Sequence, residues 1–214
     1  MLGGLGLFWV GAVLFCNGLW VLGKIGDKEI GVIDVFVGTL TLLIALYSAF
    51  GPGADAASIQ FATFLLLFTF TYYWVAWNRW NGADGRGLGW FCLFVAITCA
   101  PIFVQTLLNS HGNFWQLWLA INWASWGVLW FLFYLILARG RAELGTFTGM
   151  LCTAQGIYTG WIPGYLLVTG LIAWVVYTRI GLAVLRRAWF NVDRIWAISL
   201  VVTAGLTLLL PMQH

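Results

Sequence analysis

The sequence predicts an all-α integral membrane protein: a six-helix bundle of three antiparallel hairpins, with a seventh helix at the C-terminal end. The first observation is composition. Of the 214 residues, 62% are hydrophobic and 8% charged, whereas soluble domains are about half apolar and about a quarter charged. The second observation is spacing, because the chain divides into apolar runs of about 20 residues, the length of a bilayer-spanning helix. Short connections make consecutive helices antiparallel and leave no room for a soluble domain.

Connections rich in glycine and polar residues, such as KIGDKE and GPGADAAS, mark the expected helix ends. The first six runs form one unit, residues 1–177, and a basic segment with a further apolar run occupies 178–214. The opening MLGGLGLFWV contains no Lys or Arg, so the first run is interpreted as a retained helix rather than a secretory signal. The runs are expected at residues 3–22, 30–50, 59–77, 88–108, 115–138, 147–177 and 195–210.

Positive charge predicts the orientation of the six-helix unit. The second and fourth connections contain no Lys or Arg, whereas the first, third and fifth contain all those before residue 179. Cytoplasmic connections of membrane proteins are enriched in these residues. We therefore expect a multi-pass protein of the plasma membrane with its N-terminus outside. The basic residues concerned are Lys24, Lys28, Arg79, Arg86, Arg139 and Arg141.

The segment after the sixth run does not follow this rule. It contains Arg179, Arg186, Arg187 and Arg194, although it should emerge outside. Two interpretations stay open: a seventh helix returns the chain to the cytoplasm, or residues 179–194 form a basic surface helix.

The stretch AINWASWGVLW places Trp123, Trp126 and Trp130 in the middle of the fifth run. At 100° per residue they share one helix face within an arc of about 60°. Interfacial tryptophans would lie at the ends of the run. Taken alone, the stripe favours packing against small residues of a neighbouring helix. The alternative is a slot lined by flat aromatic rings.

Polar side chains inside the apolar runs are the other candidates for function. Gln155 and Thr159 share a face of the sixth run, and Pro163 frees a backbone carbonyl nearby. Such groups are costly in hydrocarbon unless they find partners or line a cavity. Asn17 lies in the first run and is expected to make an interhelical hydrogen bond, with contact to a solute as the minority interpretation.

No pattern indicates enzyme chemistry, a cofactor or a metal. The motifs HExxH and GxSxG are absent, and the only histidines, His111 and His214, form no cluster with metal-ligand spacing. The net charge of +3 arises at helix ends and connections, so it does not indicate nucleic-acid binding.

Four stretches, MLGGLGLFWVGAVLFCNGLW, FTYYW, ASWGVLW and TGWIP, resemble the urea and amide channel family of the UreI/AmiS type, and the amide-channel branch in particular. The resemblance extends from Met1 to about Ile172. It implies six helices per subunit in three hairpins, a pore through each protomer and a homo-hexameric ring around a lipid-filled centre. It also implies aromatic pinch points, at positions that match Trp123, Trp126, Leu129, Trp130, Phe70 and Trp74 here.

Two positions depart from the urea channel that this chain resembles. Trp74 matches a tyrosine, so one hydroxyl is expected to be lost. Gln155 matches a glutamate of the acid-gated channel, which removes a titratable group and leaves a donor and an acceptor suited to an amide.

The expected function is a passive channel for urea or short-chain aliphatic amides, which are small, planar and neutral. An apolar slot admits such molecules and excludes ions by their cost of desolvation. Three alternatives stay open: a secondary transporter of a related neutral solute, a non-transporting subunit that recruits an amidase or urease, and an intramembrane enzyme. The cytoplasmic connections are short for a docking surface, and a nucleophile with a base is missing. A functional link to a cytoplasmic amidase or urease fits the channel as well.

We predict that permeation depends weakly on pH between acid and neutral conditions. Gln155 cannot titrate, and His111 is the only histidine in an outer connection. Flux of acetamide into proteoliposomes, measured across this range, checks the prediction. A steep increase in acid would contradict it.

Overall fold

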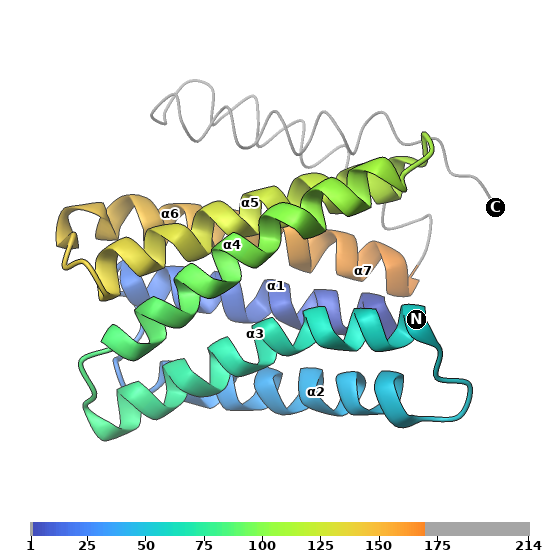
Figure 1. The fold of residues 1–214 in the computed structure, drawn as a ribbon. Helices are drawn as coiled ribbons and strands as arrows, with labels where there is room; N and C mark the ends of the chain where they lie inside the picture. The colour runs from blue at the N-terminus through green and yellow to red at the C-terminus, as the bar shows by residue number, and fades with distance from the viewer. Residues whose placement is uncertain (1, 170–214) are drawn as a thin grey trace.

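The computed structural model describes residues 2–169, and all regular structure in this range is helical (Figure 1). Short connections join the first five long helices, and a single 3₁₀ turn, η1 (Ala142–Leu144), precedes the last crossing. The long helices are α1 (Leu2–Val21), α2 (Ile30–Phe50), α3 (Ala56–Asn81), α4 (Arg86–Leu108) and α5 (Phe114–Leu137). The last crossing consists of α6 (Gly145–Gln155), the π-helix η2 (Gly156–Trp161) and α7 (Ile162–Thr169).

The expectation of an all-α membrane protein is confirmed. Each of the helices α1 to α5 is long and apolar enough to cross a bilayer. The sixth crossing is a single run of three helical segments, and Figure 1 shows the chain returning through α6 and α7 in the direction opposite to α5. Pro163 near the start of α7 has no backbone N–H, and the π-helical turn lies directly before it. The expected end of this run at residue 177 and the segment 178–214 lie outside the described residues.

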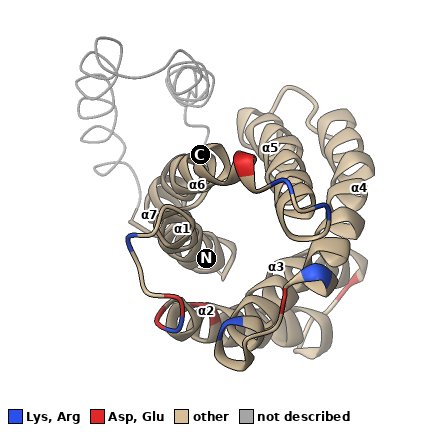
Figure 2. Ribbon diagram, turned by 90° about the vertical axis from the view of Figure 1, so that its left-hand side faces the viewer, with Lys and Arg blue, Asp and Glu red and all other residues tan. Residues whose placement is uncertain are grey.

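The charged connections gather at one end of the bundle, as the alternation of charge predicts. Figure 2 views this end, where the connections α1–α2, α3–α4 and α5–α6 and the helix ends beside them carry most of the ribbon coloured as Lys, Arg, Asp or Glu. Ion pairs neutralise part of this charge: Arg79 at the end of α3 pairs with Asp27 of the α1–α2 connection at 3.3 Å, whereas the pairs Arg86–Asp84, at 2.6 Å, and Arg141–Glu143 are local. The beginning of α1 lies at the opposite end (Figure 1).

The closest helix pairs differ from the expected hairpins. We expected the hairpins one–two, three–four and five–six to be the packing units, but the most extensive contacts join α2 with α3, α4 with α5, and α1 with the α6–η2–α7 crossing. Glycines explain the third pair, because Gly11, Gly156 and Gly160 bring the backbones of α1 and η2 into direct contact. First and last crossings therefore pack together, which closes the six helices into a ring (Figure 2).

We predict that Gly11→Ala destabilises the protein, because an added Cβ would collide with the backbone of Gly160 and Trp161. Overpacking of this kind costs about 1–3 kcal/mol. The matched control is Gly3→Ala in the same helix, where the added Cβ meets no atom within 4 Å. Thermal unfolding in detergent measures both variants. Equal unfolding temperatures would contradict the close approach of α1 and η2.

Candidate functional site

Two cavities lie one after the other along the bundle. One cavity, about 490 Å³, reaches the uncharged end of the bundle, where Ala57, Asn109 and Trp115 line it; it is called the outer cavity and the other the inner cavity, as labels for the uncharged and charged ends. The inner cavity, about 50 Å³, reaches the charged end, where Arg79 and Leu137 line it. Helices α1, α3 and α5 contribute to both walls. The two cavities therefore mark a path from one end of the bundle toward the other.

Phe68 and Trp126 separate these cavities, because they are the two residues that line both. Their rings are in edge-to-face contact, with centroids 5.1 Å apart and an angle of 87° between the planes. Phe68 also contacts Trp130 at 4.7 Å and Trp123 at 5.9 Å between centroids. The ring of Phe68 thus contacts all three tryptophans of the α5 stripe.

The tryptophan stripe faces the interior of the bundle rather than lipid. Trp123, Trp126 and Trp130 are 7%, 3% and 6% exposed. Trp123 lines the outer cavity, while Leu129 and Trp130 line the inner one. Of the two interpretations of the stripe, the geometry favours rings that border a path. Their role in permeation stays a prediction.

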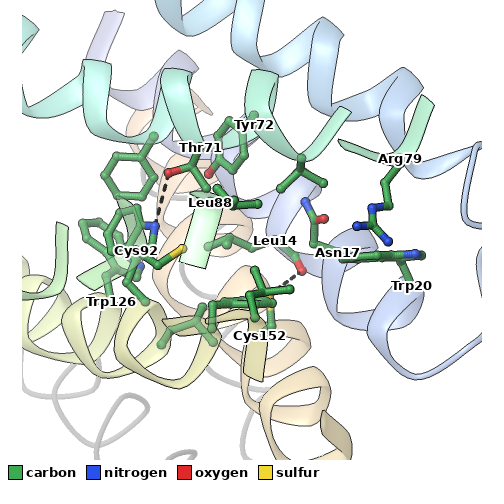
Figure 3. Close-up of a pocket in the computed structure, with 16 residues that line it drawn as sticks. Leu14, Asn17, Trp20, Thr71, Tyr72, Arg79, Leu88, Cys92, Trp126 and Cys152 are labelled. Carbon is green, nitrogen blue, oxygen red and sulfur yellow. Dashed lines mark hydrogen bonds between the residues drawn. The ribbon is translucent and has the colours of Figure 1, made fainter. Parts of the chain in front are cut away.

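Threonine hydroxyls accept hydrogen bonds from the indole N–H groups of Trp126 and Trp130. Trp126 Nε1 donates to Thr159 Oγ1 at 2.9 Å, and the Thr159 hydroxyl donates to the backbone carbonyl of Gln155 at 2.6 Å. Trp130 Nε1 donates to Thr71 Oγ1 at 3.2 Å, shown as a dashed line in Figure 3. Because both indole N–H groups have protein partners, the tryptophans present apolar ring surface to the narrow region.

Gln155 and Thr159 lie behind this wall and line neither cavity, contrary to the expectation that both line the pore. Gln155 is 3% exposed, and its Nε2 donates to the backbone carbonyl of Ser125 at 3.0 Å. Its Oε1 has no hydrogen-bond partner within residues 2–169. Thr159 lies in the π-helix that begins at Gly156 and bonds Trp126, while Gln155 bonds the neighbouring residue Ser125, so both side chains contact α5 without lining either cavity.

The geometry also corrects the assignment of Phe70 and Trp74. Phe70 is 53% exposed and contacts Trp74 and Phe91 of α4, and neither Phe70 nor Trp74 lines either of these two cavities. Residues two apart on a helix differ by about 200°. The face that meets the cavities therefore carries Phe68 and Tyr72 instead.

Sequence reasoning missed this face, although the spacing of Phe64, Phe68 and Tyr72 by four residues was a usable signal. The correction restores a hydroxyl that was expected to be lost. Tyr72 is 2% exposed, and its hydroxyl has no hydrogen-bond partner among the described residues. Tyr72 lines the inner cavity together with Thr71 and Leu88 (Figure 3).

Asn17 lines the inner cavity, and it also makes the expected interhelical bond. Its Nδ2 donates to Asp34 Oδ1 of α2 at 3.0 Å. Together with Thr71 and Tyr72 it gives this largely apolar cavity a polar side. The solute-facing interpretation of Asn17 thus gains support from its position.

The charged end of the inner cavity is formed by Trp20 and Arg79, which lie next to each other in Figure 3. The guanidinium of Arg79 lies 5.3 Å from the Trp20 ring centroid. Asp27 accepts hydrogen bonds from Arg79 Nη1 at 3.3 Å and from Trp20 Nε1 at 2.9 Å. The positive charge at this mouth is therefore paired.

Comparison with known proteins places this geometry in a family. A family model described as AmiS/UreI family transporter matches residues 2–171. A putative amidate substrates transporter protein of Mycolicibacterium smegmatis is 39% identical over 176 residues, which are 79% of this chain and 78% of that protein. The putative transporter protein AmiS2 of Rhodococcus erythropolis is 36% identical over 172 residues, 79% of this chain and 80% of that protein.

Solved structures agree with the sequence relatives. The crystal structure of the Helicobacter pylori urea channel matches with a TM-score of 0.66 and 37% identity, and the match covers 79% of this chain and 98% of that channel. The cryo-EM structure of the same channel in its closed state matches with a TM-score of 0.68 and 36% identity, over 77% of this chain and 96% of the channel. These neighbours are channels and transporters rather than enzymes. The chain belongs to the AmiS/UreI family of transporters.

Proposed function

We propose that this protein is a passive channel for urea or short-chain aliphatic amides, which cross the bundle between Phe68 and Trp126. The observation that carries the proposal is the position of this ring pair between two cavities that continue each other along the bundle. The transported compounds named for its relatives, amidates and urea, are of the same chemical class.

Selection follows from the cost of leaving water. We call the passage between the rings of Phe68 and Trp126 the slit. A neutral amide that enters it gives up a few hydrogen bonds to water, at about 1–3 kcal/mol each. An ion loses its hydration in surroundings that offer no opposite charge, which costs tens of kcal/mol in the Born approximation. The indole N–H groups of Trp126 and Trp130 are already bonded to threonines. The slit thus discriminates by charge and flatness.

Passage requires the rings to move apart. A planar solute between two ring faces needs them about 7 Å apart, twice the usual carbon–carbon contact distance, whereas the centroids of Phe68 and Trp126 lie 5.1 Å apart. Thr159 fixes the Trp126 indole by a hydrogen bond, and the Phe68 ring has no such bond. We infer that rotation of Phe68 opens the slit.

Polar groups on both sides of the slit complete the path. In the outer cavity Gln60 Nε2 donates to Gln105 Oε1 at 3.2 Å. In the inner cavity Asn17 and Tyr72 provide hydrogen-bonding groups directly beyond the rings. A solute therefore lacks hydrogen-bond partners only while it passes between the two rings, which keeps the barrier low enough for passive permeation.

We further propose that the charged end faces the cytoplasm, with the N-terminus outside, in the plasma membrane. Short cytoplasmic connections leave the inner mouth open to a soluble amidase or urease that consumes the solute. A homo-hexameric ring around lipid is the assembly that the family resemblance implies. Large apolar side chains exposed on the outer surface, such as Val32, Phe50 and Ile97, support lipid and subunit contacts there.

We predict that Trp126→Ala relaxes selection by size. Loss of the indole joins the two cavities, so permeability to propionamide relative to acetamide should rise by about tenfold, the discrimination that one methylene of fit gives in an apolar pocket. Stopped-flow swelling of proteoliposomes gives both rates. The control is Trp77→Ala, because Trp77 is 64% exposed and lines neither cavity. An unchanged ratio in a folded Trp126→Ala variant would rule out the slit.

We predict that Thr159→Val destabilises the protein by about 1–3 kcal/mol, because the buried Trp126 N–H loses its acceptor. The variant should also reduce discrimination by size, since the indole is no longer fixed. Thr98→Val is the matched control: its hydroxyl donates to a carbonyl four residues back, as that of Thr159 does, but it holds no tryptophan. If the two variants unfold at the same temperature, the bond to Trp126 contributes nothing.

A further inference from the structure

Asn17 presents a hydrogen-bond acceptor, and not a donor, to the inner cavity. The Nδ2 group of Asn17 donates to the backbone carbonyl of Val13 at 3.0 Å and to Asp34 Oδ1 at 3.0 Å. An amide nitrogen carries two hydrogens, so both are in use. The carbonyl oxygen, Oδ1, is therefore the group that Asn17 has left for the cavity that it lines.

Asp34 is what makes this orientation one-sided. Turning the Asn17 amide by 180° would place its oxygen against the Val13 carbonyl, which is an acceptor in every case, so that this hydrogen bond would be lost. The bond to Asp34 would be lost as well wherever Asp34 Oδ1 carries no hydrogen. Val13 alone would fix one hydrogen and leave the other free to point into the cavity. With Asp34 present, the cavity meets an acceptor only.

The position of Asp34 is unusual enough to call for a role. Its side chain is fully buried inside a membrane-spanning helix, and its Oδ2 has no hydrogen-bond partner within the part of the chain that the structure describes. Carboxyl groups at such positions are costly and commonly functional. The titratable groups near it are Tyr72 of α3, Cys16 of α1 and Cys152 of α6. No basic side chain is among them, so Asp34 is not held as half of an ion pair.

We propose that Asp34 is a positioning residue for solute selection: it holds Asn17 so that an acceptor faces the inner cavity, and the channel therefore prefers solutes that carry N–H donors. Urea and primary amides are such solutes, and fully N-substituted amides are not. This inference rests on the proposed channel function. It adds a chemical preference to the selection by size and charge at the slit.

Three isomers of one molecular formula test the preference: propionamide, N-methylacetamide and N,N-dimethylformamide carry two, one and no N–H hydrogens. Flux into proteoliposomes, corrected for empty liposomes, should decrease in this order. In Asp34→Leu the ratio of propionamide to N,N-dimethylformamide should fall by about fivefold, the factor that corresponds to one hydrogen bond of about 1 kcal/mol. Asp34→Asn should retain the ratio, because its side-chain oxygen still accepts from Asn17.

The ratio separates positioning from a purely structural role, since a general loss of fold lowers all three rates together. Thr41→Val is the matched control, a fully buried polar residue of the same helix that lines neither cavity. A wild-type ratio in Asp34→Leu, or an equal loss in Asp34→Asn, would overturn the proposal. If Asp34→Leu does not fold, Asn17→Leu must reduce the ratio instead, and an unchanged ratio there would also overturn it. Absence of all flux in the wild type would refute the channel itself.

Discussion

The contact between Phe68 and Trp126 is the constraint on which the account depends. These rings lie where the outer and inner cavities meet, and they come from α3 and α5, on facing sides of the path. A bilayer protein must satisfy its buried N–H groups internally. Here threonines do so for Trp126 and Trp130, from positions where each hydroxyl also donates to its own helix. As a consequence, the region between the two cavities offers a solute ring surface and few hydrogen bonds.

Polar groups are placed around this region rather than in it. Gln60 and Gln105 lie in the outer cavity, and Asn17 and Tyr72 lie in the inner one. The sequence predicts that Gln155 hydrogen-bonds an amide solute, but its Nε2 instead donates to the backbone carbonyl of Ser125, behind the tryptophans. The structure thus separates two tasks: the rings exclude charge and bulk, and amide or hydroxyl groups receive the solute on either side.

Much of the fold could be predicted from the sequence, because spans of apolar residues between glycine-rich connections reflect bilayer thickness directly. The second helix was placed at its observed bounds, 30–50, and the tryptophan stripe was assigned to one face. The residues of α3 that face the interior of the bundle are harder to predict. The stretch FTFTYYW is aromatic on every side of the helix, and periodicity alone does not say which side meets the interior. Phe68 and Tyr72 were therefore missed in favour of Phe70 and Trp74. The pairing of α1 with the last crossing depends on glycines far apart in the sequence, such as Gly11 and Gly160, which no local pattern reveals.

The most direct test of the central claim compares urea with guanidinium, two planar molecules of nearly the same shape that differ in charge. Proteoliposomes containing the wild-type protein should take up urea faster than empty liposomes, while guanidinium uptake should stay at the empty-liposome rate. Guanidinium entry as fast as that of urea, or urea entry no faster than through lipid alone, would contradict an aromatic slit that selects neutral planar solutes.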